Sequence, residues 1–276
     1  MDEKEFVESK GFNPAEAFKL KTEEPDKHQA NAQSYIKKVV GVVSGKGGVG
    51  KSMVTALMAV QAARNGMKVG ILDADVTGPS IPRMFGLHEM AGSDGEMIFP
   101  EYTRTGIPVM SLNLLLQEED QPVVWRGPVI SGALKQFWEE VAWGDLDVLF
   151  VDMPPGTGDV ALTIFQDLPV DGLVIVTSPQ ELVGMIVGKA VRMAQMMNIP
   201  VIGLVENLSF VRCPDCGKKI SIFGESHLEE TANKYGLPVL GRMPILPELA
   251  QAADQGLIET VVSQDMEDVI GGIRLQ

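Results

Sequence analysis

One short motif constrains the fold of this chain more than any other feature. It matches the pattern G-x-x-x-x-G-K-[ST], and its residues are Gly45, Lys46, Gly47, Gly48, Val49, Gly50, Lys51 and Ser52. An apolar, β-branched run at 39–43 precedes the motif, and a helical pattern at 51–65 follows it. A glycine-rich loop in this context predicts a P-loop, whose backbone N–H groups and following helix N-terminus bind phosphate.

The side chains of the motif suit the phosphates of ATP. We expect Lys51 to neutralise the β- and γ-phosphates, and the Ser52 hydroxyl to bind Mg²⁺. A glycine-rich turn without a ligand is the other interpretation, but it does not explain why strand, loop and helix occur in the right order. The motif therefore predicts an ATP-binding site with Mg²⁺.

Two further apolar runs end in carboxylates. The run 68–73 leads into Asp73 and Asp75, and the run 147–152 ends at Asp152. The carboxyl ends of parallel strands form the edge at which open α/β sheets bind ligands. We expect Asp152 to reach the Mg²⁺ shell through water, and one carboxylate of the first pair to orient the attacking water. Each acid, taken alone, also fits a cap or turn position.

Short apolar runs alternate with helical patterns along the rest of the chain. The expected strands are 39–43, 68–73, 107–112, 147–152, 172–177, 200–205 and 237–242. The expected helices are 51–65, 128–142, 180–197, 225–235 and 246–255. This alternation predicts an α/β fold with a doubly wound, mainly parallel sheet of about seven strands and helices on both faces.

The length of the chain favours a single domain with short appendages. Its 276 residues, of which 45% are hydrophobic, can bury a sizeable core. We expect 37–276 to form a P-loop NTPase domain and 1–36, which lack sustained periodicity, to form a mobile N-terminal tail. Residues 86–105 fit an irregular loop or small hairpin at the sheet edge, and the acidic stretch 265–268 fits a solvated helix face.

Charge and hydropathy exclude several classes of partner. The net charge is −14 at pH 7, whereas binding to nucleic-acid phosphates needs a basic face. No apolar stretch approaches the roughly 18 to 20 residues of a membrane span. The N-terminus also lacks the basic and apolar regions of a secretory signal. We therefore expect a cytoplasmic protein that binds neither nucleic acid nor a membrane.

The only two cysteines of the chain, Cys213 and Cys216, form a C-x-x-C pair. This spacing is typical of a metal or redox pair and not of a disulfide framework. An iron–sulfur cluster such as 4Fe-4S, or a zinc ion, takes about four protein ligands, which a homodimer with two such pairs would supply. Zinc with His227 as an extra ligand and thioredoxin-like redox chemistry are the alternatives, and His227 also fits a surface position at a helix start.

The large apolar side chains fit structural positions better than ligand-binding ones. The tryptophans are expected in the core or an interface, and three methionines on one predicted helix are expected to pack in the core. These residues are Trp125, Trp138 and Trp143, and Met193, Met196 and Met197.

Four segments carry a family resemblance. The additional lysine of the P-loop, Lys46, resembles that of the deviant Walker A ATPases, in which it reaches the nucleotide of a partner subunit, and this implies a homodimer. The segments Asp73-Ala-Asp-Val-Thr-Gly-Pro-Ser-Ile-Pro-Arg-Met84, Asp152-Met-Pro-Pro-Gly-Thr-Gly-Asp159 and Cys213-Pro-Asp-Cys-Gly217 resemble the Mrp/ApbC iron–sulfur carrier ATPases. The resemblance spans roughly 38–258.

This resemblance implies roles for particular residues. Asp75 would position the hydrolytic water, Asn207 would contact adenine, and the cysteine pair would bind an iron–sulfur cluster for transfer to apo-proteins. Met53 stands where the family usually has threonine, and the N-terminal ferredoxin-like cysteine cluster of some members is absent. The resemblance therefore implies a minimal ATP-dependent carrier.

A second function class shares the same nucleotide fold. A MinD/ParA-like positioning ATPase with a structural zinc knuckle would need a basic amphipathic helix or a basic surface for its membrane or DNA client. The tail 261–276 instead contains one arginine and several acids. A reductase with a cluster bridging its two subunits would place its cysteines on separate loops. The carrier is therefore the expected function, and the positioning ATPase is the alternative.

Overall fold

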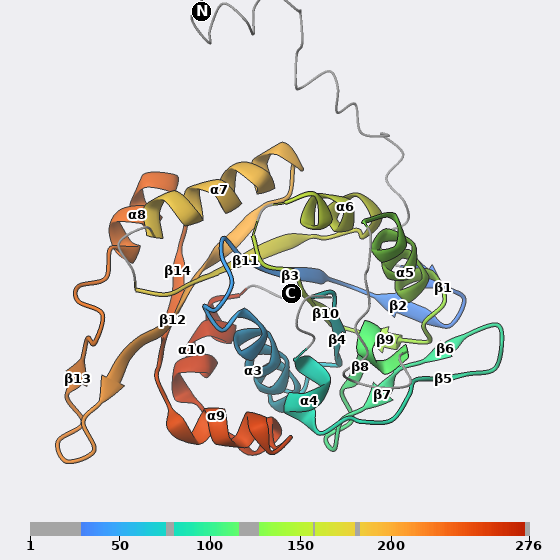
Figure 1. The fold of residues 1–276 in the computed structure, drawn as a ribbon, viewed down its shortest axis with the longest axis horizontal. Helices are drawn as coiled ribbons and strands as arrows, with labels where there is room; N and C mark the ends of the chain where they lie inside the picture. Colours follow the sequence, from blue (N-terminus) through green and yellow to red (C-terminus); the bar gives the residue numbers. More distant parts are fainter. Residues whose placement is uncertain (1–28, 76–79, 116–126, 157, 180–182, 274–276) are drawn as a thin grey trace, which may run out of the picture.

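The computed structural model describes residues 29–75, 80–115, 127–156, 158–179 and 183–273. Within these residues a nine-stranded sheet forms the centre of the molecule (Figure 1). Its strands are β3 (Val39–Ser44), β4 (Val69–Asp73), β7 (Glu101–Tyr102), β8 (Pro108–Ser111), β10 (Val148–Asp152), β11 (Gly172–Thr177), β12 (Val201–Arg212), β13 (Lys219–Ile220) and β14 (Val239–Pro244).

The strand order confirms the predicted α/β fold. The strands follow the order β13-β12-β11-β3-β10-β4-β8-β7, and β14 also pairs with β12. All pairings among the seven predicted strands are parallel, whereas β7 and β13 join antiparallel at β8 and β12. One prediction is too short, because the strand expected at 200–205 continues as β12 to Arg212.

Helices cover both faces of the sheet, as expected for a doubly wound fold (Figure 1). One face carries α5 (Gly127–Glu139), α6 (Asp159–Asp167), α7 (Val183–Met196) and α8 (Leu228–Tyr235), and the other carries α3 (Lys51–Arg64), α4 (Ile81–Phe85), α9 (Pro247–Asp254) and α10 (Gln264–Gly272). The side chains of β10 alternate between the two cores: Leu149 and Val151 join the first, and Val148 and Phe150 join the second. Burial on both faces explains why the strands are continuous apolar runs.

Three helices were not among the five expected ones. The helix α4 has only five residues, which is too few to show helical periodicity, whereas α6 and α10 have nine residues each. For α10 a signal was available, because the Ser263 side chain accepts a hydrogen bond from the Met266 N–H and caps the helix. The acidic stretch 265–268 lies on α10, in agreement with its expected position on a helix.

The expected N-terminal tail is wrong for its last eight residues. Residues 29–36 form two short antiparallel strands, β1 (Gln29–Asn31) and β2 (Ser34–Ile36), and β9 (Gly144–Leu146) pairs with β2. Ile36 is fully buried, and the Ser34 hydroxyl donates to the Val141 carbonyl. Strands of three residues are too short to show alternation, so the sequence pattern did not reveal them. The rest of the expected tail lies outside the described residues.

The segment 86–105 contains the small hairpin expected at the sheet edge. Its strands β5 (Gly92–Ser93) and β6 (Ile98–Phe99) pair antiparallel, and β7 then joins the edge of the main sheet. Two 3₁₀ turns also occur, one after β8 at Leu112–Leu115 and one after α9 at Ile258–Thr260. Among the described helices, none combines the length and apolar character needed to cross a membrane.

The predicted core side chains are buried, with one exception. Trp138, Trp143, Met193 and Met197 are buried, whereas the side chain of Met196 is 60% exposed. The Trp143 indole also donates a hydrogen bond to the Phe137 carbonyl. Trp125 lies outside the described residues.

Candidate functional site

The P-loop lies where the sequence predicted it, between β3 and α3. The backbone φ is +80° at Gly48 and +76° at Gly50, a left-handed conformation that glycine adopts without steric cost. A side chain at Gly45 would also clash with Ile186 of α7, at 2.2 Å from its methyl group. The loop therefore needs glycine both for its curvature and for its fit against the neighbouring helix.

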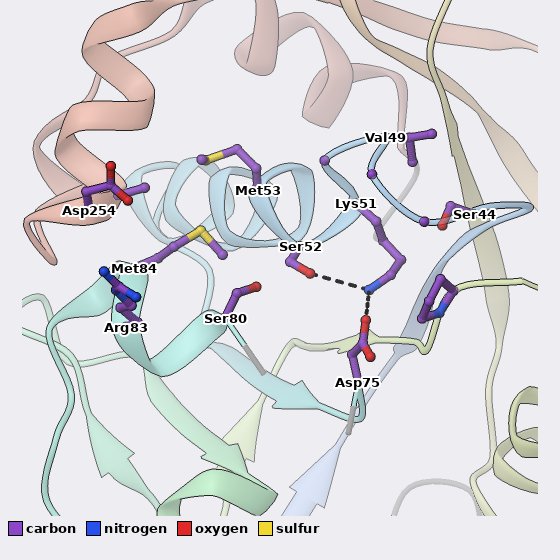
Figure 2. A pocket seen from close by; sticks show the side chains of 15 residues that line it. Ser44, Val49, Lys51, Ser52, Met53, Asp75, Ser80, Arg83, Met84 and Asp254 are labelled. Atoms are coloured by element: carbon purple, nitrogen blue, oxygen red, sulfur yellow. Dashed lines mark hydrogen bonds and ion pairs between the residues drawn. The ribbon is translucent and has the colours of Figure 1, made fainter. Parts of the chain in front are cut away.

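Lys51, the first residue of α3, is surrounded by carboxylates. Its Nζ lies 2.7 Å from Asp152 Oδ1. It also lies 3.5 Å from Asp75 Oδ2 and 3.4 Å from the Ser52 hydroxyl (Figure 2). The Lys51 side chain is only 5% exposed, and Asp152 is fully buried. The three charged residues predicted from the sequence thus meet at one point: Lys51 at the start of α3, Asp75 after β4 and Asp152 at the end of β10.

Two hydroxyl groups and one ammonium group surround the Asp152 carboxylate. Its Oδ2 accepts a hydrogen bond from Ser52 at 2.5 Å, and its Oδ1 accepts one from Thr55 at 2.8 Å. Burial raises the pKa of Asp152, while Lys51 opposes that rise. A serine hydroxyl beside a buried carboxylate is an oxygen donor set that suits Mg²⁺. The sequence analysis missed Thr55, although its i+3 spacing from Ser52 places both hydroxyls on one helix face.

A third carboxylate, Asp73, reinforces this acidic cluster. It is 1% exposed at the end of β4, where it accepts hydrogen bonds from the Asp75 N–H at 3.1 Å and the Ser111 hydroxyl at 3.3 Å. Burial raises the pKa of Asp73 well above its usual value, and the neighbouring Asp152 raises it further. Asp73 therefore holds the turn that carries Asp75, and its bonds are made within the protein.

A cavity of about 570 Å³ opens in front of the P-loop. Figure 2 shows that Lys51, Ser52 and Asp75 face it from one side, and Arg83 and Asp254 face it from the other. This volume lies within the range of small-ligand sites, about 300 to 1,000 Å³. Its far wall is formed by α4, by the residue before α4 and by α9, with the residues Ser80, Arg83, Met84, Ala253 and Asp254. None of these was predicted as a site residue, although 80–84 belongs to one of the segments that carry the family resemblance.

Asn207 contacts the P-loop itself. Its Nδ2 donates to the Val49 carbonyl at 2.9 Å, and the side chain is 4% exposed. Gly50 packs so closely against it that a Cβ there would lie 2.3 Å from Nδ2. Asn207 lies within β12, beyond the end of the strand expected at 200–205. Its predicted contact with adenine stays a prediction.

Lys46 lies in the P-loop, directly before its two exposed glycines, Gly47 and Gly48. The residue is half-buried, and its carbonyl accepts a hydrogen bond from the Ser44 hydroxyl at 2.9 Å. Its expected partner is a nucleotide on another subunit, so this role also stays a prediction.

The cysteine pair forms the turn of a hairpin that extends from the body of the molecule (Figure 1). β12 enters this turn and β13 leaves it, and the Gly217 N–H donates to the Cys213 carbonyl at 2.9 Å. Gly217 has φ +70°, which allows the tight turn. Backbone N–H groups of Cys216 and Asp215 lower the pKa of the Cys213 thiol. Both thiols are free, and Cys216 is exposed.

His227 does not join the cysteine pair. It occupies the N-cap position of α8 without a capping hydrogen bond from its side chain, and its Nδ1 lies 3.3 Å from Glu230 Oε2. In the described part of the chain, no group of three or more histidine, cysteine, aspartate or glutamate side chains is arranged to hold a metal ion. The surface position expected for His227 is confirmed. Within the described residues, the structure does not bring His227 together with the cysteine pair as the extra ligand of the alternative zinc site.

Comparisons with known proteins agree on one family for this chain. A family model described as ParA: NUBPL iron-transfer P-loop NTPase matches residues 35–272. A protein of Clostridium perfringens named iron-sulfur cluster carrier protein is 48% identical over 238 residues, or 83% of this chain and 84% of its own. A protein of the same name from Methanocaldococcus jannaschii is 45% identical over 245 residues, or 86% and 84% of the two chains.

Solved structures agree with the sequence relatives. A nucleotide-binding protein from Archaeoglobus fulgidus, solved in complex with ADP, is 45% identical with a TM-score of 0.75, and the match covers 84% of this chain and 90% of that one. MinD of Aquifex aeolicus in its complex with MinC is 20% identical with a TM-score of 0.60, over 85% and 94% of the chains. This second similarity concerns the fold alone.

Proposed function

This chain belongs to the NUBPL iron-transfer P-loop NTPase family, and from that membership we propose that it is an ATP-dependent iron–sulfur cluster carrier. In this proposal it binds and hydrolyses ATP, holds a labile cluster between two subunits and transfers the cluster to apo-proteins. One observation carries the proposal: a complete P-loop site and an exposed two-thiolate turn occur in a chain with no other cysteine.

The nucleotide would bind in the cavity in front of the P-loop. Loop N–H groups and Lys51 would hold the β- and γ-phosphates, and Asn207 would support the loop from behind while its amide edge contacts adenine. Ser52 and, through water, Asp152 would hold Mg²⁺, which would neutralise charge on the phosphates. The contact between these two side chains supports the assignment, because it places both oxygen donors on one side of the site.

Hydrolysis would depend on positioning and charge. Asp75 accompanies Lys51 at the cavity wall, where it would orient the attacking water in line with the γ-phosphate. Lys46 of the partner subunit would stabilise the charge that develops on the phosphate. We expect this hydrolysis to be slow and coupled to cluster binding or transfer, since the carrier must keep its cargo until an acceptor arrives.

The cluster is the cargo, and we propose a 4Fe-4S cluster shared by two subunits. Cys213 and Cys216 provide two of about four protein ligands, so a second copy of the chain would complete the set. Exposed apolar side chains on the same hairpin support an interface there: Ile220, Ile222 and Phe223 are 48%, 56% and 52% exposed. The lowered pKa of Cys213 also favours the thiolate that binds iron.

Two further expectations belong to this proposal. Residues 29–273 would form one P-loop NTPase domain, with the cysteine turn at 213–217 as its only functional extension among the described residues. The reducing cytosol would be the compartment, because it keeps both thiols available for a cluster.

Anaerobic reconstitution with iron and sulfide tests the proposal. We would compare the wild type with the Cys213→Ala/Cys216→Ala variant by visible absorption, iron and zinc analysis, and size-exclusion chromatography with light scattering. The expected result is one 4Fe-4S cluster per dimer in the wild type and no cluster in the variant. Stoichiometric zinc without a cluster would instead favour a positioning ATPase with a structural knuckle, and a cluster on a strict monomer would refute the shared site.

A further inference from the structure

A buried carboxylate, Glu206, lies midway along β12 and belongs to neither the nucleotide cavity nor the cysteine pair. Its side chain is 0% exposed, and it lies in register with Thr177 of β11 and Arg242 of β14. Burying a carboxylate is costly unless hydrogen bonds and opposite charge compensate it. The partners of Glu206 therefore indicate what the protein gains by keeping it there.

These partners connect the two ends of the segment that carries the cysteines. Glu206 Oε2 accepts from the Ser209 hydroxyl and Oε1 accepts from the Ser226 hydroxyl, each at 2.5 Å. Ser226 comes after the cysteine hairpin, and its Oγ also accepts from the Leu228 N–H at the start of α8. The chain thus continues from Glu206 along β12, passes through the cysteine turn and returns to the same carboxylate at Ser226.

Positive charge holds the carboxylate from the side of β14. Arg242 Nε lies 3.6 Å from Glu206 Oε2, and the same guanidinium binds Glu229 of α8 at 2.9 Å. The ion pair of Arg212 with Asp265 of α10, at 2.7 Å, is a further tie between the hairpin and the body. Of these two ties, Glu206 is the one that is adjacent in sequence to a residue that contacts the P-loop.

The next residue, Asn207, is the one that binds the P-loop through the Val49 carbonyl. Consecutive strand residues point to opposite sides, so one side chain reaches the P-loop and its neighbour reaches the hairpin base. A bulge accompanies this arrangement: the five residues of β12 from Glu206 to Phe210 lie opposite only three residues of β14, Arg242 to Pro244. Leu208 within it has φ +57°, a left-handed conformation that is costly for leucine.

We propose that Glu206 is a positioning residue that transmits the state of the P-loop to the cysteine hairpin through Ser226. Movement of the P-loop carries Asn207 with it, and the adjoining peptide then moves the Glu206 carboxylate and the hydroxyl it holds. The strained bulge is a place where a second arrangement of the strand costs little extra. This inference rests on the proposed function, since it explains how nucleotide could control the hold on the cluster.

Alkylation of the two thiols in the full-length protein without cluster tests the relay directly. The rate of reaction with iodoacetamide would be measured with no nucleotide, with Mg-ADP and with Mg-ATP. Couplings between sites commonly amount to about 5- to 150-fold, so we expect the wild-type rate to change at least about fivefold with nucleotide. Ser226→Ala should reduce this change to less than about twofold, at an unchanged affinity for a fluorescent nucleotide.

Ser209→Ala is the matched control. It removes the other 2.5 Å hydroxyl bond to the same carboxylate, but Ser209 is part of β12 and does not connect to the returning segment. This variant should keep the wild-type response to nucleotide. A Ser226→Ala protein that keeps the full response, or a loss that is equal in both variants, would overturn the relay.

Failure of the relay and failure of the carrier function would give different results. If the wild-type thiols respond to nucleotide but no cluster can be reconstituted, the carrier proposal fails and the relay stands. If a cluster binds and its release to a chelator depends on nucleotide while the thiol rates do not, the relay is refuted and the carrier proposal stands.

Discussion

At the scale of single residues, the site depends on how Lys51 is compensated. Its ammonium lies between the buried Asp152 and the nearby Asp75, and the hydroxyls of Ser52 and Thr55 complete the shell of Asp152. Charges removed from water are stable only with such partners. The site is therefore built around one cation, and variants at that position should separate binding from the later steps.

Lys51→Ala should lower the affinity for ATP by at least about a hundredfold. Hydrogen bonds to charged groups contribute about 1.5 to 3 kcal/mol each, and Lys51 would bind two phosphates.

Lys46→Ala should keep ATP affinity within about twofold and lose hydrolysis, because its proposed phosphate contact forms only across a dimer. Equilibrium binding of a fluorescent nucleotide and phosphate release measure the two properties. Equal loss of binding in both variants would contradict these roles.

Cys213 should react with alkylating reagents at lower pH in the folded protein than in the unfolded one. The N–H groups of Cys216 and Asp215 stabilise its thiolate and lower its pKa, and the thiolate is the reactive form. In a Cys216→Ala variant only Cys213 reacts, and the backbone donors remain. The pH of half-maximal alkylation rate should be lower in buffer than in concentrated urea. The same or a higher pH in buffer would show that the turn does not stabilise the thiolate.

At the scale of elements, the P-loop and β12 form one structural unit. Asn207 binds the Val49 carbonyl, and Gly50 leaves no room for a side chain beside that amide. The nucleotide loop is therefore supported by the strand whose far end carries the cysteines. Two glycines of the loop with similar backbone conformation allow this support to be tested.

Gly50→Ala should weaken nucleotide binding much more than Gly48→Ala. Both glycines have positive φ, so both substitutions add backbone strain of about 1 kcal/mol. Only the Cβ at position 50 would also collide with Asn207, at 2.3 Å, whereas the space at position 48 is open within 4 Å. Titration with a fluorescent nucleotide measures the difference. Similar affinities in the two variants would mean that the contact of Asn207 does not support the binding conformation.

At the scale of the whole molecule, two cores lie on either side of one sheet, and the proposed nucleotide site joins elements from several parts of the chain. The cavity is lined by the P-loop, by the turn after β4, and by α4 and α9. A ligand that binds there should stabilise the folded state as a whole. We treat residues 29–273 as one proposed domain, which should unfold in a single transition.

Mg-ADP at about one hundred times its dissociation constant should stabilise the fold by about 2.7 kcal/mol. For a domain of this size such a gain raises the Tm by roughly 5 to 10 °C. The gain from adding Mg²⁺, measured as the increase with Mg-ADP minus the increase with ADP in EDTA, should be smaller in Asp152→Asn than in the wild type, because the amide weakens the proposed Mg²⁺ site. The measurement in EDTA accounts for the lost ion pair with Lys51. Differential scanning calorimetry gives these values. Two separate transitions, of which only one shifts, would contradict a single domain.

The sequence by itself determined the parts of this protein that depend on local chemistry. Each of these parts needs particular residues in a short stretch of sequence. Glycines indicate the P-loop, apolar β-branched runs indicate the seven parallel strands, and two closely spaced thiols indicate the C-x-x-C turn. The acids at the strand ends could be selected for the same reason, since the carboxyl edge of a parallel sheet is where such folds bind ligands.

Only the tertiary structure decided which distant side chains meet. Thr55 joins the cluster at Asp152 because α3 and β10 pack together, and no motif marks this residue. Asp73 could be selected from the sequence as a strand-end carboxylate, but only the structure places it beside Asp152. The support of the P-loop by Asn207 and the closure of the hairpin at Glu206 both depend on a bulge in β12. The strands β1 and β2 are too short for a periodic signal, so pairing with each other and with β9 defines them. Contacts between segments far apart in the chain arise from packing, and a local pattern carries no record of them.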